Sequence, residues 1–69
     1  MDEFKLAGQE FIELNNLLKI KNLVDSGGTA KTVIAEGRVK VDGTIELRRR
    51  CKIRTGQKVE FEGRTIVVI

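Results

Sequence analysis

The sequence predicts an α+β fold, in which a two-helix motif packs on a small, mostly antiparallel β-sheet. Apolar residues recur with a helical period between residues 14 and 37, and the period changes to two from residue 38 onward. The length of 69 residues, with 41% hydrophobic and 33% charged residues, suits one globular domain. We therefore expect a single domain over residues 1–69.

The first helix is expected around Leu14, Leu17 and Leu18, because positions i, i+3 and i+4 share one face of a helix. Asn22 can end this helix, since asparagine tolerates the left-handed conformation that is common just past a helix C-terminus. Residues 23–24 then lie in a turn and are expected to dip into the core.

The second helix is expected to begin after Ser26, whose hydroxyl can accept a hydrogen bond from a free amide of the first turn. Ala30, Val33 and Ile34 form its apolar face, and Gly37 ends it. Two short helices joined by a tight turn make a pair that is similar to a helix-turn-helix.

The remaining chain predicts strands. Residues 38–41 alternate polar and apolar side chains, and the Asp42-Gly43 pair that follows is a strong signal for a hairpin turn. Residues 44–47 form the expected return strand, and the basic run after them interrupts the pattern as a loop or an irregular strand. Further strands are expected at residues 4–6, 57–61 and 65–69.

Positive charge is concentrated in the middle of the chain. Residues 14–58 carry eleven Lys or Arg against four acidic residues, a net charge of +7, whereas residues 1–13 carry −3 and residues 59–69 carry −1. Such a concentration favours a polyanionic partner, and nucleic acid is the commonest one. A solvated basic surface that only keeps the protein soluble is the alternative.

The sequence lacks the residues that several kinds of catalytic or metal site require. There is no histidine and Cys51 is the single cysteine, so common zinc sites and the usual base for a nucleophile are missing. A Walker-type phosphate loop is absent. Sulfur carriers and ubiquitin-like modifiers of similar size need a C-terminal Gly-Gly, whereas residues 66–69 read as a buried strand. We expect no enzymatic activity, no cofactor and no metal.

The compartment can also be predicted. No apolar run approaches the roughly 20 residues that span a bilayer, and the first ten residues lack the apolar core of an export signal. A single cysteine fits a reducing compartment. We expect a cytoplasmic monomer without membrane contact.

From Leu14 to Val59 the sequence resembles the RNA-binding domain named after the small-subunit ribosomal protein S-four, also called the alpha-L motif. The match is an ordered set of features without a gap from Leu14 through Gly43, and the alpha-L core covers about residues 12–60. The glycine pair after Ser26, the basic run and the short length resemble the stand-alone bacterial members of the family. The matching residues are Leu14, Leu18, Ser26, Ala30, Ile34, Gly37, Val39, Val41, Asp42, Gly43, Gly56 and Val59.

The resemblance implies non-catalytic binding of structured RNA, either ribosomal or transfer RNA, with ribosomal particles as a further partner. The sequence departs from the family at Gly27, where many members carry arginine directly after the capping serine. Asn15 stands where the family often has aspartate, and Lys21 stands where it has an apolar residue. A phosphate contact of the missing arginine must therefore come from elsewhere or be lost.

The expected RNA surface combines the start of the second helix, the strand after it and the basic run. Amides at a helix N-terminus favour anions, and small residues beside Lys31 let an RNA backbone approach closely. Arginine suits phosphate because its planar fork donates two hydrogen bonds. The candidate RNA-binding residues are Ser26, Gly27, Gly28, Lys31, Arg38, Lys40, Arg48, Arg49, Arg50, Lys52 and Arg54.

Two further expectations concern the phenylalanines and the cysteine, and one alternative function is also considered. Phe4, Phe11 and Phe61 are expected in the core rather than as stacking platforms, so that RNA is bound by shape and phosphate geometry. Cys51 lies between cations that could lower its pKa, but we expect a half-buried structural thiol. The alternative function is a small protein-interaction module whose basic face meets an acidic protein.

Overall fold

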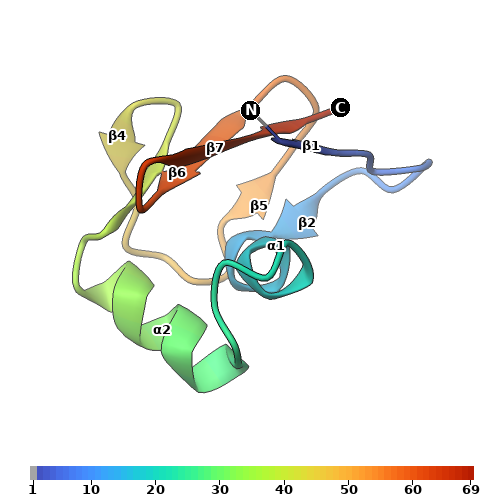
Figure 1. The fold of residues 1–69 in the computed structure, drawn as a ribbon. Helices are drawn as coiled ribbons and strands as arrows, with labels where there is room; N and C mark the ends of the chain where they lie inside the picture. Colours follow the sequence, from blue (N-terminus) through green and yellow to red (C-terminus); the bar gives the residue numbers. More distant parts are fainter. Residues whose placement is uncertain (1) are drawn as a thin grey trace.

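The computed structural model describes residues 2–69 and has the expected α+β architecture, with two helices beneath a twisted sheet (Figure 1). None of the helices in this range is long and apolar enough to cross a membrane. The elements, in chain order, are β1 (Asp2–Phe4), β2 (Ile12–Glu13), α1 (Leu14–Ile20), α2 (Gly27–Ala35), β3 (Val39–Val41), β4 (Thr44–Ile45), β5 (Lys52–Ile53), β6 (Lys58–Phe61) and β7 (Arg64–Val68).

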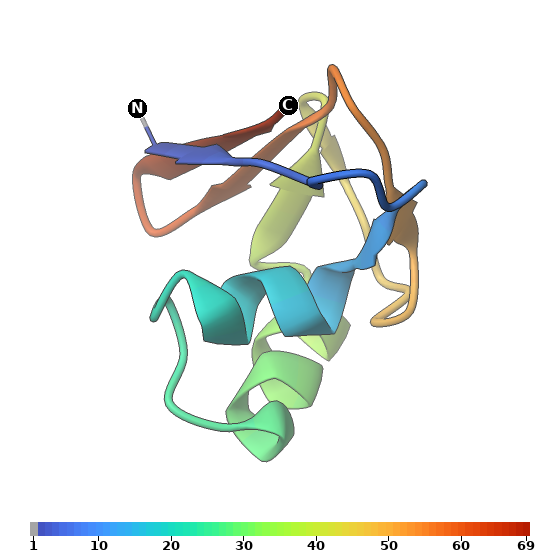
Figure 2. The same cartoon turned by 90° about the vertical axis from the view of Figure 1, so that its right-hand side faces the viewer.

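The main sheet has the strand order β1-β7-β6-β3-β4. All neighbours are antiparallel except β1, which runs parallel to β7 and joins the two ends of the chain. The strands β2 and β5 form a separate two-stranded sheet beside the start of α1 (Figure 2). The mostly antiparallel sheet predicted from the sequence is therefore confirmed.

The core lies between the main sheet and the helices. The helical residues that were predicted to face inward are buried, and so is every second residue of β3, β6 and β7, as the two-residue period of strands requires. Residues on the sheet face that points away from the helices are exposed or half-buried. The core comprises Leu6, Ile12, Leu14, Leu17, Leu18, Val24, Ala30, Val33, Ile34, Val39, Val41, Ile53, Val59, Phe61, Ile66 and Val68.

The predicted turns occur where the backbone needs unusual conformations. Asn22 follows α1 with a φ of 58°, which asparagine accepts more readily than most residues. Asp42 and Gly43 have φ values of 52° and 83°, the pattern of a tight hairpin turn whose twist matches its strands. Gly37 has a φ of 75° just past α2, as expected for a residue that ends a helix.

The first strand was predicted at the wrong place. The expectation was residues 4–6, whereas β1 covers Asp2–Phe4 because it is set by parallel pairing with β7. Leu6 is buried just after the strand, and its amide donates to the carbonyl of Ile69 over 2.9 Å. The strand β2 was not predicted, and β5 lies within the basic run that was expected to be a loop or an irregular strand. The strands β3, β6 and β7 differ from expectation by one residue at their ends, and β4 is shorter than the predicted residues 44–47.

Candidate nucleic-acid interface

The loop between β4 and β5 closes the start of α1. This helix begins directly after β2, and Glu13 makes no capping hydrogen bond with its side chain. The amides of Leu14 and Asn15 instead donate to the carbonyls of Cys51 and Arg49, each over 2.9 Å. The free amides of a first turn need such acceptors, so the main chain of the arginine-rich loop is held against α1.

The start of α2 is capped as predicted. The hydroxyl of Ser26 accepts a hydrogen bond from the amide of Thr29 over 3.2 Å. Gly27 and Gly28 occupy the first two helical positions, and both are exposed. A β-carbon added at Gly28 would meet only the Ser26 hydroxyl, at 3.8 Å, so the surface at this helix end is open.

Lys19, which was not among the predicted RNA-binding residues, lies beside this helix end. Its ammonium nitrogen is 3.8 Å from the point where a β-carbon on Gly27 would lie. Lys19 is in the last turn of α1, where a cation interacts favourably with the helix dipole. The sequence does contain a signal for this residue. It is a lysine in the last turn of the first helix, followed by a glycine pair at the start of the second.

The exposed face of α2 carries Lys31 and Ala35, and its far end meets the β4–β5 loop. Both residues are exposed, as the predicted stripe requires. A β-carbon at Gly37 would lie 3.6 Å from Ile45 and 4.0 Å from Leu47. Figure 2 shows this loop next to the β2 end of α1, so α1, α2 and the loop form one continuous side of the molecule.

The three consecutive arginines have different surroundings. Arg48 donates to both carboxylate oxygens of Glu46, over 2.9 and 3.1 Å, and this bond holds the pKa of Glu46 down at about 2. Arg49 and Arg50 are exposed, and within residues 2–69 they form no ion pair. A shallow hollow of about 380 Å³ is lined by Arg48, Arg50, Cys51 and Lys52.

Lys52 and Arg54 lie on β5 and just after it, where they cover an aromatic ring. The Lys52 ammonium is 5.0 Å from the centre of the Phe11 ring, and the Arg54 guanidinium is 5.7 Å from it. Both distances suit cation–π interactions. The expectation that all three phenylalanines belong to the core is therefore wrong for Phe11, which is half-buried and outside the core cluster. Its neighbour Ile12 takes the inward position of β2 instead.

Arg38 and Lys40 lie on the other side of the main sheet. They alternate with the buried Val39 of β3 and so point away from the helices, as predicted. Arg38 pairs with Glu36 and Glu62 and lies 5.5 Å from the centre of the Phe61 ring. Lys40 is directly opposite Glu60 on β6. The structure therefore does not join these two residues to the helix side, and acidic neighbours offset their charge.

Cys51 behaves as a structural thiol. Its side chain is partly buried and packs against the core. Burial raises its pKa, and the nearby Glu46 carboxylate adds to this effect, although Arg48 opposes it. A raised pKa disfavours the thiolate, which is the reactive form.

Comparisons with known proteins identify the family to which this fold belongs. A family model described as "S4 domain" matches residues 4–69. The chain is 48% identical to YbcJ of Escherichia coli over 69 residues, which cover all of this chain and 99% of YbcJ. It is 39% identical to the probable ribosome maturation protein RlbA of Bacillus subtilis over 54 residues, covering 78% of this chain and 76% of RlbA.

The solution structure of Escherichia coli YbcJ superposes with a TM-score of 0.76, covering all of this chain and 87% of that one. That structure is described as revealing an αL motif involved in RNA binding. The fold and the two-helix motif thus define a small domain of the S4 type. The chain belongs to the S4 domain family, and the predicted resemblance to its stand-alone bacterial members is confirmed.

Proposed function

We propose that this protein binds structured RNA, ribosomal or transfer RNA, without catalysing a reaction. The observation that carries the proposal is the hollow formed by Arg48, Arg50 and Lys52, where three cations surround one depression on the loop that closes α1. Only Arg48 of these has an acidic partner among the described residues. Like charges held this closely favour an anion between them, and phosphate suits the arginine fork.

The remaining contacts extend along the helix side. Lys19, the amides of Gly27 and Gly28, and Lys31 supply positive potential at the start of α2. Ser26 orders this helix end by capping it. Arg49, Lys52 and Arg54 continue the surface on the loop and on β5. Arg38 and Lys40 contribute less in this proposal, because acidic side chains face them.

Relatives support the choice of RNA. The structure of YbcJ is described as containing a motif involved in RNA binding, and the name of RlbA refers to ribosome maturation. A ribosomal particle or its RNA is therefore the first partner to test. The partly buried Cys51, with its raised pKa, supports a binding role rather than nucleophilic catalysis.

The test is RNA affinity measured over a range of salt concentrations. If four to six phosphates are neutralised, the logarithm of the affinity should fall linearly with the logarithm of the salt concentration, with a slope of about −3 to −5. The ligand is a ribosomal RNA hairpin, and a polyanion such as heparin is the control for charge alone. An affinity that does not change with salt contradicts the proposal.

A protein-interaction module is the second candidate function, and one observation favours it. Ile45 and Leu47 are 53% and 61% exposed and lie together beside Gly37. Exposed apolar neighbours can mark a protein contact. Capture of partners from a lysate with and without ribonuclease separates the two functions, because only RNA-mediated partners are lost after the treatment.

A further inference from the structure

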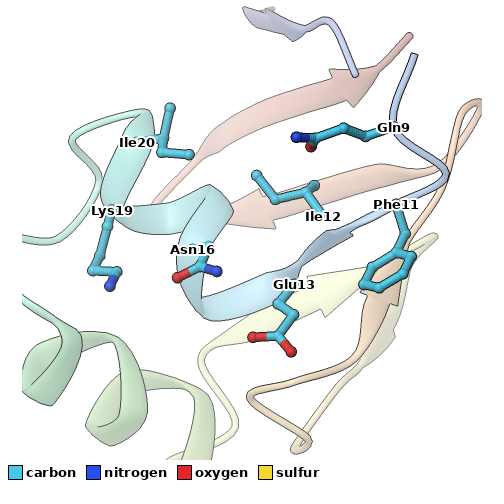
Figure 3. A pocket seen from close by; sticks show the side chains of 7 residues that line it. All are labelled: Gln9, Phe11, Ile12, Glu13, Asn16, Lys19 and Ile20. Atoms are coloured by element: carbon cyan, nitrogen blue, oxygen red, sulfur yellow. The ribbon is translucent and has the colours of Figure 1, made fainter. Parts of the chain in front are cut away.

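A second hollow shares the Phe11 side chain with the cations Lys52 and Arg54. It has a volume of about 450 Å³ and is lined by residues of the N-terminal segment and of α1 (Figure 3). None of its lining residues comes from β5, whereas Lys52 of β5 and Arg54 just after it approach the same ring. Phe11 therefore borders both the hollow and two cations. The lining consists of Gln9, Phe11, Ile12, Glu13, Asn16, Lys19 and Ile20.

The chemistry of this lining suits a nucleobase. Phe11 offers an aromatic ring, and Ile20 offers an exposed apolar side chain on α1. Gln9, Asn16 and Glu13 place amide and carboxylate groups around the hollow (Figure 3), and these groups form hydrogen bonds with base edges. A volume of this size is in the range of pockets that hold small organic ligands.

The exposure of Phe11 is not explained by packing. The residue precedes β2, whose Ile12 already fills the inward position opposite Ile53. Phe11 instead lies beside the outer face of the small sheet, where Lys52 of β5 and Arg54 just after it approach its ring. An aromatic ring beside phosphate-binding cations is the usual platform for an unpaired base.

We propose that this hollow binds one unpaired nucleotide of the RNA, whose base stacks on Phe11 while the adjoining phosphates contact Lys52 and Arg54. The inference rests on the proposed RNA-binding function and adds a preference for RNA with a bulged or looped-out base. It differs from the expectation of binding by phosphate geometry alone, because the structure places Phe11 outside the core.

The experiment compares two RNA hairpins, one fully paired and one with the same stem and a single bulged adenosine. The parent protein should bind the bulged hairpin about tenfold more tightly, as expected for one stacked base. Phe11→Leu should remove this difference and keep the affinity for the paired hairpin. Phe4→Leu is the matched control, since Phe4 packs against the core on β1, and it should keep the preference.

A second readout does not depend on the leucine variant. The chain has no Trp or Tyr, so Phe11→Trp introduces a single fluorophore into the hollow. Its fluorescence should be quenched by the bulged hairpin and not by the paired one. Equal quenching by both hairpins would overturn the base site.

The outcomes distinguish this inference from the function on which it rests. If the parent binds both hairpins equally well, or if Phe11→Leu weakens both equally, the base site is wrong while RNA binding stands. If the parent binds neither hairpin, the proposed function itself fails. A bulge preference that is lost in Phe11→Leu and kept in Phe4→Leu supports the nucleotide site.

Discussion

The amide of Asn15 donates a hydrogen bond to the carbonyl of Arg49 over 2.9 Å, so the arginine-rich loop is fixed to α1 through its main chain. The neighbouring bond from Leu14 to Cys51 has the same length and also uses only backbone atoms. The side chains of Arg49 and Arg50 are exposed and, within residues 2–69, form no ion pair. The fold therefore does not require these two guanidinium groups.

Replacing Arg49 and Arg50 together with alanine should weaken RNA binding and leave the fold intact. Phosphate contacts carry no base information, so the loss should be similar for many RNA sequences. The slope of log affinity against log salt should become shallower by about 1.5 if two phosphate contacts are lost. Fluorescence anisotropy at several salt concentrations measures both effects, and circular dichroism checks the fold.

Lys5→Ala is the control for this double variant. Lys5 is exposed in the net-negative N-terminal segment, away from the loop in sequence and on the β1 side of the main sheet. Its replacement should change affinity little. If the double arginine variant binds RNA like the parent while Lys5→Ala binds more weakly, the predicted binding surface is wrong. The RNA would then contact the side of the domain that carries Lys5.

Gly28→Glu should reduce RNA affinity tenfold or more without unfolding the protein. A β-carbon at this position meets only the Ser26 hydroxyl, at an ordinary distance of 3.8 Å. A carboxylate in the first turn of a helix is favoured by the helix dipole, so the variant should be at least as stable as the parent. The negative charge would repel a phosphate approaching the start of α2.

Gly28→Gln is the matched control, since glutamine has nearly the size of glutamate without its charge. It should weaken binding only slightly. Equal losses in the two variants would show that size rather than charge matters at this helix end, and would contradict a phosphate contact there. Urea unfolding of both variants verifies that they are folded.

The sequence predicted those parts of the fold that depend on local periodicity. Leu14, Leu17 and Leu18 share a helix face, and all three are fully buried. The Asp42-Gly43 turn could also be predicted, because few dipeptides accept two consecutive positive φ angles. In both cases the decisive residues are close together in the chain, so their spacing alone specifies their geometry.

Long-range pairings could not be predicted in this way. The β2–β5 sheet pairs only Ile12 with Ile53 and Glu13 with Lys52, across about forty residues of chain. A strand of two residues is too short to show alternation, and the sequence does not show which distant segment it pairs with. The same pairing brings Phe11 close to Lys52, which is why its place beside the candidate interface was missed.

Ser26→Ala should lower the free energy of unfolding by about 1 kcal/mol, the usual effect of removing an N-cap. The Ser26 hydroxyl accepts from the amide of Thr29, and alanine cannot replace that acceptor. Ser26→Asp restores an acceptor and should recover most of the stability. Urea unfolding monitored by circular dichroism measures both. A Ser26→Ala variant as stable as the parent would show that this cap contributes nothing.

Glu46→Gln should destabilise the protein at neutral pH, and the effect should fade in acid. Three hydrogen bonds from Arg48 to the Glu46 carboxylate, including one from its amide, lower the pKa of this group from 4.5 to about 2. Its side chain is only 17% exposed, so solvent screens the pair incompletely. A pKa that is lower in the folded state than in the unfolded state stabilises the fold at pH values above the unfolded value.

The contribution of Glu46 should therefore be complete above about pH 5 and should disappear as the pH falls through about 2. Urea unfolding of the parent and of Glu46→Gln at pH 7, 4 and 2.5 should give a difference in stability that shrinks along this series. In an Arg48→Ala background the same substitution should produce a smaller difference with a weaker pH dependence, because the two guanidinium bonds are gone while the main-chain amide of residue 48 still donates to Glu46. A difference that stays constant from pH 7 to 2.5 in the parent background would show that the Arg48 bond does not stabilise the loop through the ionised carboxylate.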